Sequence, residues 1–286
     1  MSSASSGHPT YPDLAARRIA IDEAMASQSM AAGVEVETLE EAGFSGVRFV
    51  PAGARPGTAI IHFHGGGLRL GSTKGWGPFM TRLAAATRTE VVGVDYALAP
   101  EHPYPAASLQ AEAAYEFLAA QRRSIVLAGD SAGCNLASGL ALRLAERADA
   151  RHVGTMLFSP WIDLRVQNAS YAECAADDAL FSREAAEQAA ESYAPGMDVA
   201  DPAISPGLGD WHRQPPVLLE TSANEVLRDD ARALAQKLLA SGVRLWFREV
   251  AGQPHDWHII DPPTPATRDS FASAAAFLDS VQAPES

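Results

Sequence analysis

Residues Ser124–Gly133 read SIVLAGDSAG and join an apolar run to a G-x-S-x-G pattern, which makes them the most informative part of the sequence for the fold. The apolar run is typical of a buried strand, and a helical pattern follows it. A serine between two glycines at a strand-to-helix turn is typical of a nucleophile elbow, which exposes the serine hydroxyl at the edge of a sheet. The glycines leave room for the tight turn. An ordinary glycine-rich turn is the alternative, so the rest of the chain must distinguish the two.

Strand-like and helix-like patterns alternate along most of the 286 residues. Expected strands are Val34–Val36, Gly46–Val50, Ala59–Phe63, Val91–Val94, Ile125–Leu127, Val153–Phe158, Val217–Leu219 and Val243–Phe247. Expected helices span roughly 77–88, 105–121, 132–148, 183–192, 228–241 and 266–282. Near-continuous apolar strands that alternate with helices predict an α/β fold, with a mostly parallel eight-stranded sheet covered by helices on both faces.

No linker rich in Pro, Gly or Ser divides the chain, so we expect residues 1–286 to form a single domain. The interval 160–215 breaks the alternation, because it holds one expected helix and is too long for a plain crossover. A further helix is expected near Leu14–Met30, where there is no strand for it to follow. We therefore predict a helical cap above the sheet, formed by about 1–32 and 165–212.

Composition excludes several classes of partner. The net charge is −13 without a clustered basic patch, so we expect no nucleic-acid partner. No uncharged apolar stretch approaches the ~20 residues of a membrane span, and the N-terminus lacks the features of a secretory signal. Cys134 and Cys174 are too few for a disulfide framework and are interpreted as free thiols in a reducing compartment. These observations predict a cytoplasmic protein.

Four features fall where predicted strands end, at the edge where open α/β sheets bind their ligands. They are Ser131, the loop His64–Gly67, Glu225 and His255. Consecutive glycines in the loop let backbone N–H groups approach a ligand, as an oxyanion hole requires. A flexible loop or a phosphate cradle is the alternative, although the spacing of a phosphate-binding loop is absent. The chain order serine, acid, histidine matches the triad of an α/β hydrolase.

Longer segments extend this pattern from about residue 40 to the C-terminus. His64–Gly67, Gly129–Gly133, Asp95–Ala107, Ser159–Leu164 and Asp201–Pro206 resemble the bacterial hormone-sensitive-lipase-like esterases. The resemblance implies an α/β-hydrolase core, a helical cap, and hydrolysis of carboxylic esters with short or medium acyl groups. It implies no metal or cofactor, and by analogy a homodimer. The chain departs from the family at Ala97, where Arg is usual, and at Cys134, where Gly is usual.

Roles follow from the resemblance position by position. Ser131 would attack the ester carbonyl, His255 would accept its proton, and Glu225 would orient the imidazole. The tetrahedral oxyanion would accept hydrogen bonds from backbone N–H groups, and removal of one such donor typically costs a factor of ~10²–10³ in rate. The expected donors are Gly65, Gly66 and Ala132, and the expected substrate contacts are Trp76, Asp130, Phe181, Tyr193 and His258.

Two assignments have rivals nearby in the sequence. Asp229 competes with Glu225, which is favoured because it matches the first acidic position of the family pattern, whereas Asp229 suits the start of a helix. His258 competes with His255 and is interpreted as a pocket or packing residue. His62, inside an expected strand, is interpreted as structural.

The function that these features favour is a carboxylesterase acting on a small-molecule ester. A lactone hydrolase or an amidase could use the same triad, and the sequence does not separate them. The rival from another class is an α/β-hydrolase module that binds ligands without catalysis. It is disfavoured because the serine, acid and histidine motifs are all present.

Overall fold

The computed structural model describes residues 11–122, 124–260 and 263–282, so the first ten residues of the expected cap lie outside the described part. The described strands form one eight-stranded sheet in the order β1-β2-β4-β3-β5-β6-β7-β8. The first two pairings, β1 with β2 and β2 with β4, are antiparallel, and the rest are parallel. The strand bounds are β1 (Val34–Glu41), β2 (Phe44–Pro51), β3 (Thr58–Phe63), β4 (Glu90–Val94), β5 (Ser124–Asp130), β6 (His152–Phe158), β7 (Val217–Ser222) and β8 (Leu245–Val250).

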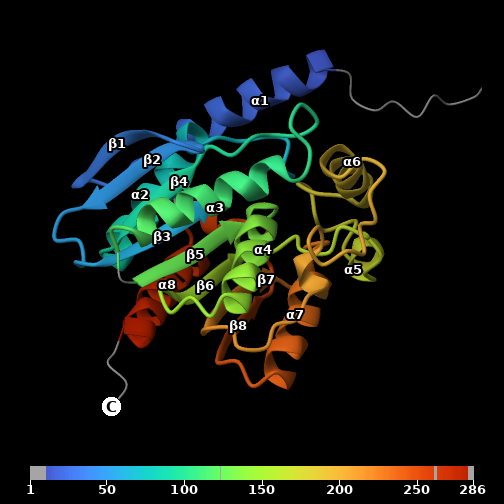
Figure 1. Cartoon of the computed structure of the whole chain (residues 1–286). Coiled ribbons are helices and arrows are strands. Elements are labelled where there is room, and N and C mark those ends of the chain that lie inside the picture. The colour runs from blue at the N-terminus through green and yellow to red at the C-terminus, as the bar shows by residue number, and fades with distance from the viewer. Residues whose placement is uncertain (1–10, 123, 261–262, 283–286) are drawn as a thin grey trace, which may run out of the picture.

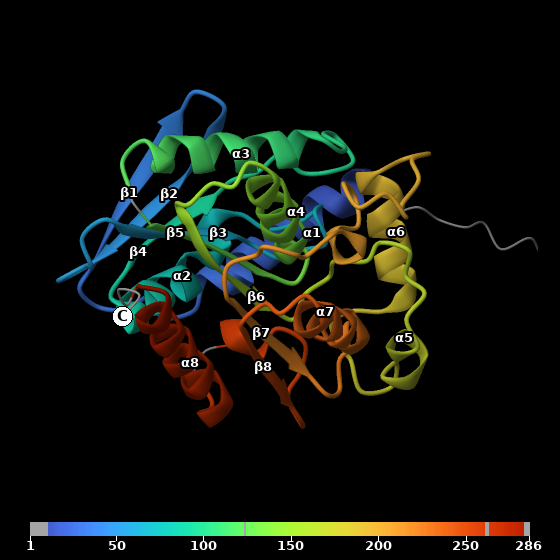
Figure 2. The same ribbon diagram turned by 60° about the horizontal axis from the view of Figure 1, so that its bottom comes forward.

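Helices cover both faces of the sheet, as Figure 2 shows. Helices α2 and α8 pack on one face, while α3, α4 and α7 pack on the other. The helix bounds are α1 (Tyr11–Ala26), α2 (Thr73–Thr87), α3 (Ala106–Ala119), α4 (Gly133–Glu146), α5 (Ser170–Glu173), α6 (Arg183–Tyr193), α7 (Arg228–Ala240) and α8 (Pro265–Gln282). The predicted α/β fold with a mostly parallel sheet is confirmed.

The core lies in two layers because successive strand residues point to opposite faces. In β3, Ile60 packs in the layer under α2 and α8, whereas Ile61 packs in the layer under α3 and α4. Val126 and Leu127 divide in the same way along β5. All four side chains are fully buried. Burial on both faces explains why these strands read as continuous apolar runs instead of alternating patterns.

One helix in the 160–215 interval was not expected. Helix α5 is a single turn, too short to produce a periodic apolar pattern. The N–H of Ser170 donates to Asp229 Oδ2 at 3.0 Å, and its hydroxyl donates to the carbonyl of Val226 at 2.6 Å. Contacts with a distant segment therefore hold this turn. Figure 1 shows α5 and α6 together beyond the carboxyl ends of the central strands.

Candidate active site

Ser131 occupies a sharp turn between β5 and α4. Its φ of 49° lies in the left-handed region, which side chains rarely adopt outside functional turns. The chain can turn this tightly only because glycines flank it: a Cβ on Gly129 would lie 2.5 Å from the carbonyl carbon of Gly133, and one on Gly133 would lie 1.9 Å from the carbonyl oxygen of Phe63. The geometry is that of a nucleophile elbow.

A continuous chain of hydrogen bonds links the serine, the histidine and the glutamate. Nε2 of His255 lies 2.9 Å from Ser131 Oγ, and its Nδ1 lies 2.6 Å from Glu225 Oε2. The other carboxylate oxygen of Glu225 accepts from the Thr221 hydroxyl at 2.5 Å and from the Ser222 N–H at 2.8 Å. Both Glu225 and His255 are buried. The carboxylate is therefore fixed on one side by β7 and presents its free oxygen to the imidazole.

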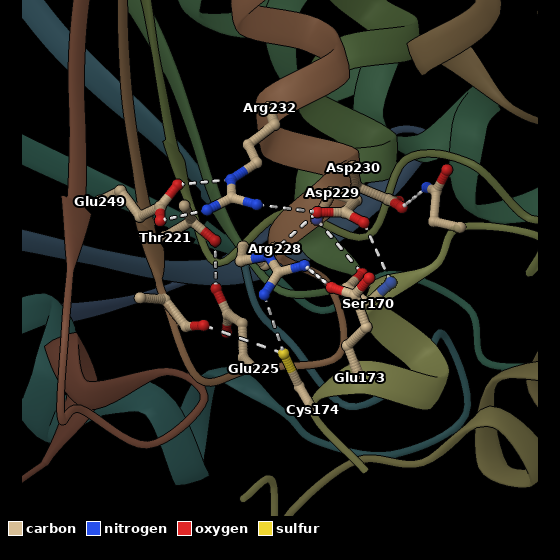
Figure 3. Close-up of polar contacts among 12 residues, drawn as sticks. Ser170, Glu173, Cys174, Thr221, Glu225, Arg228, Asp229, Asp230, Arg232 and Glu249 are labelled. Carbon is tan, nitrogen blue, oxygen red and sulfur yellow. Dashed lines mark hydrogen bonds and ion pairs between the residues drawn. The ribbon is translucent and has the colours of Figure 1, made fainter.

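The rival acid, Asp229, belongs to another network. Its carboxylate accepts from the Arg228 guanidinium at 3.0 Å and from the N–H of Ser170 at 3.0 Å, as Figure 3 shows. The adjacent Asp230 accepts from backbone N–H groups of the segment after β6. These aspartates thus tie the start of α7 to the segment that carries α5, whereas Glu225 is the candidate that reaches Nδ1 of His255.

The rival histidine, His258, belongs to a separate buried cluster and does not line the cavity above Ser131. It is only 1% exposed, and its Nε2 lies 3.2 Å from Glu220 Oε2. Glu220 also pairs with Arg248 at 2.6 Å and accepts from the Ser270 hydroxyl at 2.5 Å. The predicted substrate contact for His258 is therefore wrong, because its side chain is enclosed in a buried polar cluster beneath β7 and α8.

The hydrogen bonds of the loop after β3 differ from the expected set of oxyanion donors. The N–H of Gly65 donates to Asp130 Oδ2 at 3.0 Å, so this hydrogen points at a carboxylate and is not free for a substrate. In the described part of the chain, the N–H groups of Gly66, Gly67 and Ala132 have no acceptor. Gly66 and Gly67 have positive φ angles of 108° and 65°. Gly67 therefore replaces Gly65 in the expected set.

Asp130 is expected from the sequence to contact the substrate, but its buried carboxylate instead supports the loop. The same Oδ2 that accepts from Gly65 accepts from Trp76 Nε1 at 2.9 Å, and Oδ1 lies 3.2 Å from His62 Nε2. Asp130 is fully buried, so a ligand cannot reach it. Its position explains why a buried carboxylate precedes Ser131: it holds the oxyanion loop and the Trp76 side chain in place.

A cavity of about 340 Å³ opens above Ser131 and His255. Trp76 and Phe181 line it, as expected from the sequence. The prediction for Tyr193 is wrong, because that ring is outside the lining and packs edge-on against Tyr104 with centroids 5.8 Å apart. The remaining lining is Arg17, Ile21, Met25, Gln28, Gly66, Gly67, Arg69, Leu70, Leu180, Ala185, Asp256, Ile259 and Ile260.

Asp256 is a lining residue that the sequence analysis missed. A left-handed backbone, with φ of 54°, places its Oδ2 3.3 Å from His255 Nε2. Burial lowers the pKa of His255, but the carboxylates of Asp256 and Glu225 outweigh burial and raise that pKa to about 10. Burial raises the pKa of Asp256 well above its usual value, against the opposing effect of a charged His255. The two groups therefore compete for one proton.

Three further findings concern metal-binding groups, cysteines and membrane spans. Within the described ranges, histidines, cysteines and carboxylates nowhere gather in groups of three or more that could hold a metal ion. Cys134 and Cys174 are buried free thiols. No helix among the described residues has the length and apolar character needed to cross a bilayer.

Residues 60–259 match the family model described as the alpha/beta hydrolase fold. The chain belongs to the α/β-hydrolase family. This α/β hydrolase is 33% identical to an acetyl-hydrolase of Streptomyces hygroscopicus, over 95% of its own length and 91% of the relative's. It is 32% identical to an esterase of Acinetobacter venetianus, with 87% and 83% covered.

Solved structures agree with these relatives. This α/β hydrolase superposes on an esterase from the bacterial hormone-sensitive lipase family with a TM-score of 0.89 at 29% identity, with 96% and 93% of the two chains covered. A mutant of the esterase E40 gives a TM-score of 0.90, also at 29% identity, with 95% and 93% covered. The chain therefore belongs with the hormone-sensitive-lipase-like esterases. The predictions of family, fold and enzyme class are confirmed.

Proposed function

We propose that this α/β hydrolase is a serine carboxylesterase that cleaves esters with short to medium acyl groups through a Ser131–His255–Glu225 triad. The observation that carries the proposal is the unbroken hydrogen-bond chain, 2.9 Å from serine to imidazole and 2.6 Å from imidazole to carboxylate. A serine hydroxyl is a weak nucleophile until a base takes its proton, and His255 is positioned to do so. Glu225 fixes the tautomer whose Nδ1 carries hydrogen and whose Nε2 is free to accept.

The reaction then proceeds in two halves. Ser131 Oγ forms a bond to the ester carbonyl carbon as its proton passes to His255 Nε2, and the carbonyl oxygen becomes an oxyanion. The N–H groups of Gly66, Gly67 and Ala132 would stabilise that charge. His255 returns the proton to the departing alcohol, which leaves an acyl-enzyme. Water repeats the sequence on the acyl-enzyme and releases the acid and the free serine.

The cavity supports a small substrate. A volume of about 340 Å³ is at the lower end of ligand pockets, which span roughly 300–1,000 Å³. Residues of α1 and of the segment 180–185 line it opposite the nucleophile. We accordingly propose that about 1–32 and 165–212 form a cap on a single domain and limit the acyl length. A p-nitrophenyl ester series should give its highest kcat/KM below about ten acyl carbons.

The test of the proposal compares p-nitrophenyl butyrate hydrolysis by the wild type and Ser131→Ala. Loss of roughly 10³-fold or more in kcat with retained folding supports the triad, and equal rates would overturn it. The homodimer implied by the resemblance stays a prediction. Light scattering tests it, because a dimer has twice the chain mass of 30.2 kDa.

A further inference from the structure

Arg69 is a buried cation in the wall of the cavity above Ser131. It lies in the turn that follows Gly66 and Gly67, and only 4% of its surface is exposed. One of its terminal nitrogens, Nη2, donates to the carbonyl of Ala185 at 3.3 Å. Its Nε is buried and has no partner. A guanidinium presents five N–H donors in a planar fork, so most of the donors of Arg69 are uncommitted.

No carboxylate among the described residues lies within ion-pair distance of this guanidinium. The adjacent charge is another cation, Arg17, which lies on α1 and lines the same cavity. Burial, with a further contribution from Arg17, lowers the pKa of Arg69 to about 10, and the side chain still carries its charge at neutral pH. A buried charge without a counterion is costly, so the arrangement is incomplete as a structural element.

Arg18, which follows Arg17 on α1, contrasts with Arg69. Its guanidinium forms two hydrogen bonds of 2.7 Å with Glu101 and donates to the carbonyls of Ala99 and Arg69. Arg18 thus has the counterion that Arg69 lacks, and it holds the backbone of Arg69 in place. The difference between the two arginines indicates that the counterion of Arg69 comes from outside the described chain.

The position of Arg69 selects one side of the substrate. A Cβ built on Gly67 would lie 4.0 Å from Arg69 Nε, so the guanidinium adjoins the oxyanion loop. The leaving alcohol must instead face His255 Nε2, where Asp256 Oδ2 is 3.3 Å away. A carboxylate on the alcohol would meet the oxygen atoms of Asp256, whereas one on the acyl group would not.

We propose that Arg69, assisted by Arg17, binds a carboxylate at the far end of the acyl group, so that the preferred substrates are monoesters of short dicarboxylic acids. This inference rests on the proposed esterase function. Arginine suits the role because its fork pairs with both oxygens of a carboxylate. The apolar lining opposite, which includes Ile21 and Met25, would accept a small neutral alcohol.

The test compares esters that differ only in the terminal group. Monoethyl glutarate carries the carboxylate, ethyl 5-methylhexanoate replaces it with an isopropyl group of the same shape, and ethyl 4-aminobutyrate carries a cation. Hydrolysis is followed by pH-stat titration at neutral pH. We expect the wild type to favour monoethyl glutarate over the isopropyl analogue by at least about tenfold in kcat/KM, and to disfavour the amine.

Variants assign the preference to the guanidinium. Arg69→Met should remove it, mainly through a higher KM for the glutarate ester, and leave hydrolysis of ethyl 5-methylhexanoate within about threefold. Arg69→Lys keeps the charge and should keep part of the preference, which separates binding from a folding defect. Arg232→Met, on the exposed pair with Glu249, is the matched control and should change nothing.

The outcomes distinguish a failure of this inference from a failure of the proposed esterase function. Equal hydrolysis of the glutarate ester and its isopropyl analogue by the wild type would overturn the inference but not the proposed esterase function. So would a preference that survives Arg69→Met, or a stronger preference for a carboxylate placed on the alcohol, as in O-acetyl glycolate. Failure of the wild type to hydrolyse any of these esters, charged or neutral, would overturn both.

Discussion

Asp256 Oδ2 lies 3.3 Å from His255 Nε2, the same nitrogen that hydrogen-bonds Ser131. The imidazole therefore lies between two carboxylates, with Glu225 on Nδ1 and Asp256 on Nε2. Glu225 serves the tautomer that the reaction needs. Asp256 instead favours a proton on the nitrogen that must be free to accept one, so this carboxylate opposes the first step of catalysis.

The first prediction concerns pH. Burial lowers the pKa of His255, and Asp256 and Glu225 outweigh it to bring the pKa to about 10. The base works only when neutral, so kcat/KM should rise with pH through the neutral and alkaline range. Asp256→Asn removes one carboxylate and should move the rising limb down by about one to three pH units, with higher activity at pH 7.

Profiles of kcat/KM for ethyl 5-methylhexanoate from pH 5 to pH 10 check this prediction. Asp210→Asn removes an exposed carboxylate outside the cavity and serves as the control. A limb that stays in place, or that moves to higher pH, would show that Asp256 does not set the basicity of the imidazole.

The second prediction separates the two candidate acids. Glu225→Gln keeps the shape but removes the charge that stabilises the imidazolium, so kcat should fall by roughly 10²–10⁴-fold. Asp229→Asn weakens contacts with Ser170 and Arg228 and should leave kcat within about threefold. Steady-state kinetics on both variants decide which residue is the triad acid. A larger loss of kcat in Asp229→Asn than in Glu225→Gln would reverse the assignment.

The third prediction tests the role of Asp130 beneath the oxyanion loop. Asp130→Ala leaves the N–H groups of Gly65 and Trp76 buried without their acceptor. Each orphaned donor costs about 1–3 kcal/mol, so the loss of the acceptor for both should lower the free energy of unfolding by about 2–6 kcal/mol. Urea denaturation followed by tryptophan fluorescence measures it. Unchanged stability would mean that Gly65 is free to serve the substrate after all.

The fourth prediction concerns the two histidines. His255→Ala removes the base and should abolish measurable turnover. His258→Ala breaks the pair with Glu220 in a fully buried cluster, so it should lower the free energy of unfolding by about 2–4 kcal/mol and leave kcat within about tenfold. Thermal unfolding and kinetics on the pair are the measurement. The reverse pattern would exchange their roles.

The sequence predicts the parts of the site that chain order controls. Parallel strands end at one edge, so Ser131, Glu225 and His255, each following a strand, had to meet there. The same logic predicts the sheet, because strands buried on both faces show as apolar runs. It fails for Tyr193, since helical position alone does not say which way a ring turns within the cap.

Other features depend on side-chain contacts that spacing does not encode. Gly65 is expected from the sequence to be an oxyanion donor, but the side chain of Asp130, at the end of the neighbouring strand β5, accepts a hydrogen bond from its N–H. Asp256 adjoins His255 in sequence, yet only its left-handed backbone turns the carboxylate toward Nε2. Arg69 gave one usable signal, a lone arginine between two leucines in a glycine-rich loop.

The most direct test of the central claim is stoichiometric labelling with a fluorophosphonate, read by intact mass and peptide mapping. We predict one adduct per chain, on Ser131, with activity lost in proportion to labelling. Ser131→Ala should remain unlabelled, and Asp229→Asn should label like the wild type. The triad assignment would be contradicted if Ser131 stayed unlabelled and the protein kept full activity after prolonged exposure to the reagent. It would also be contradicted if an adduct on another serine accounted for the inactivation.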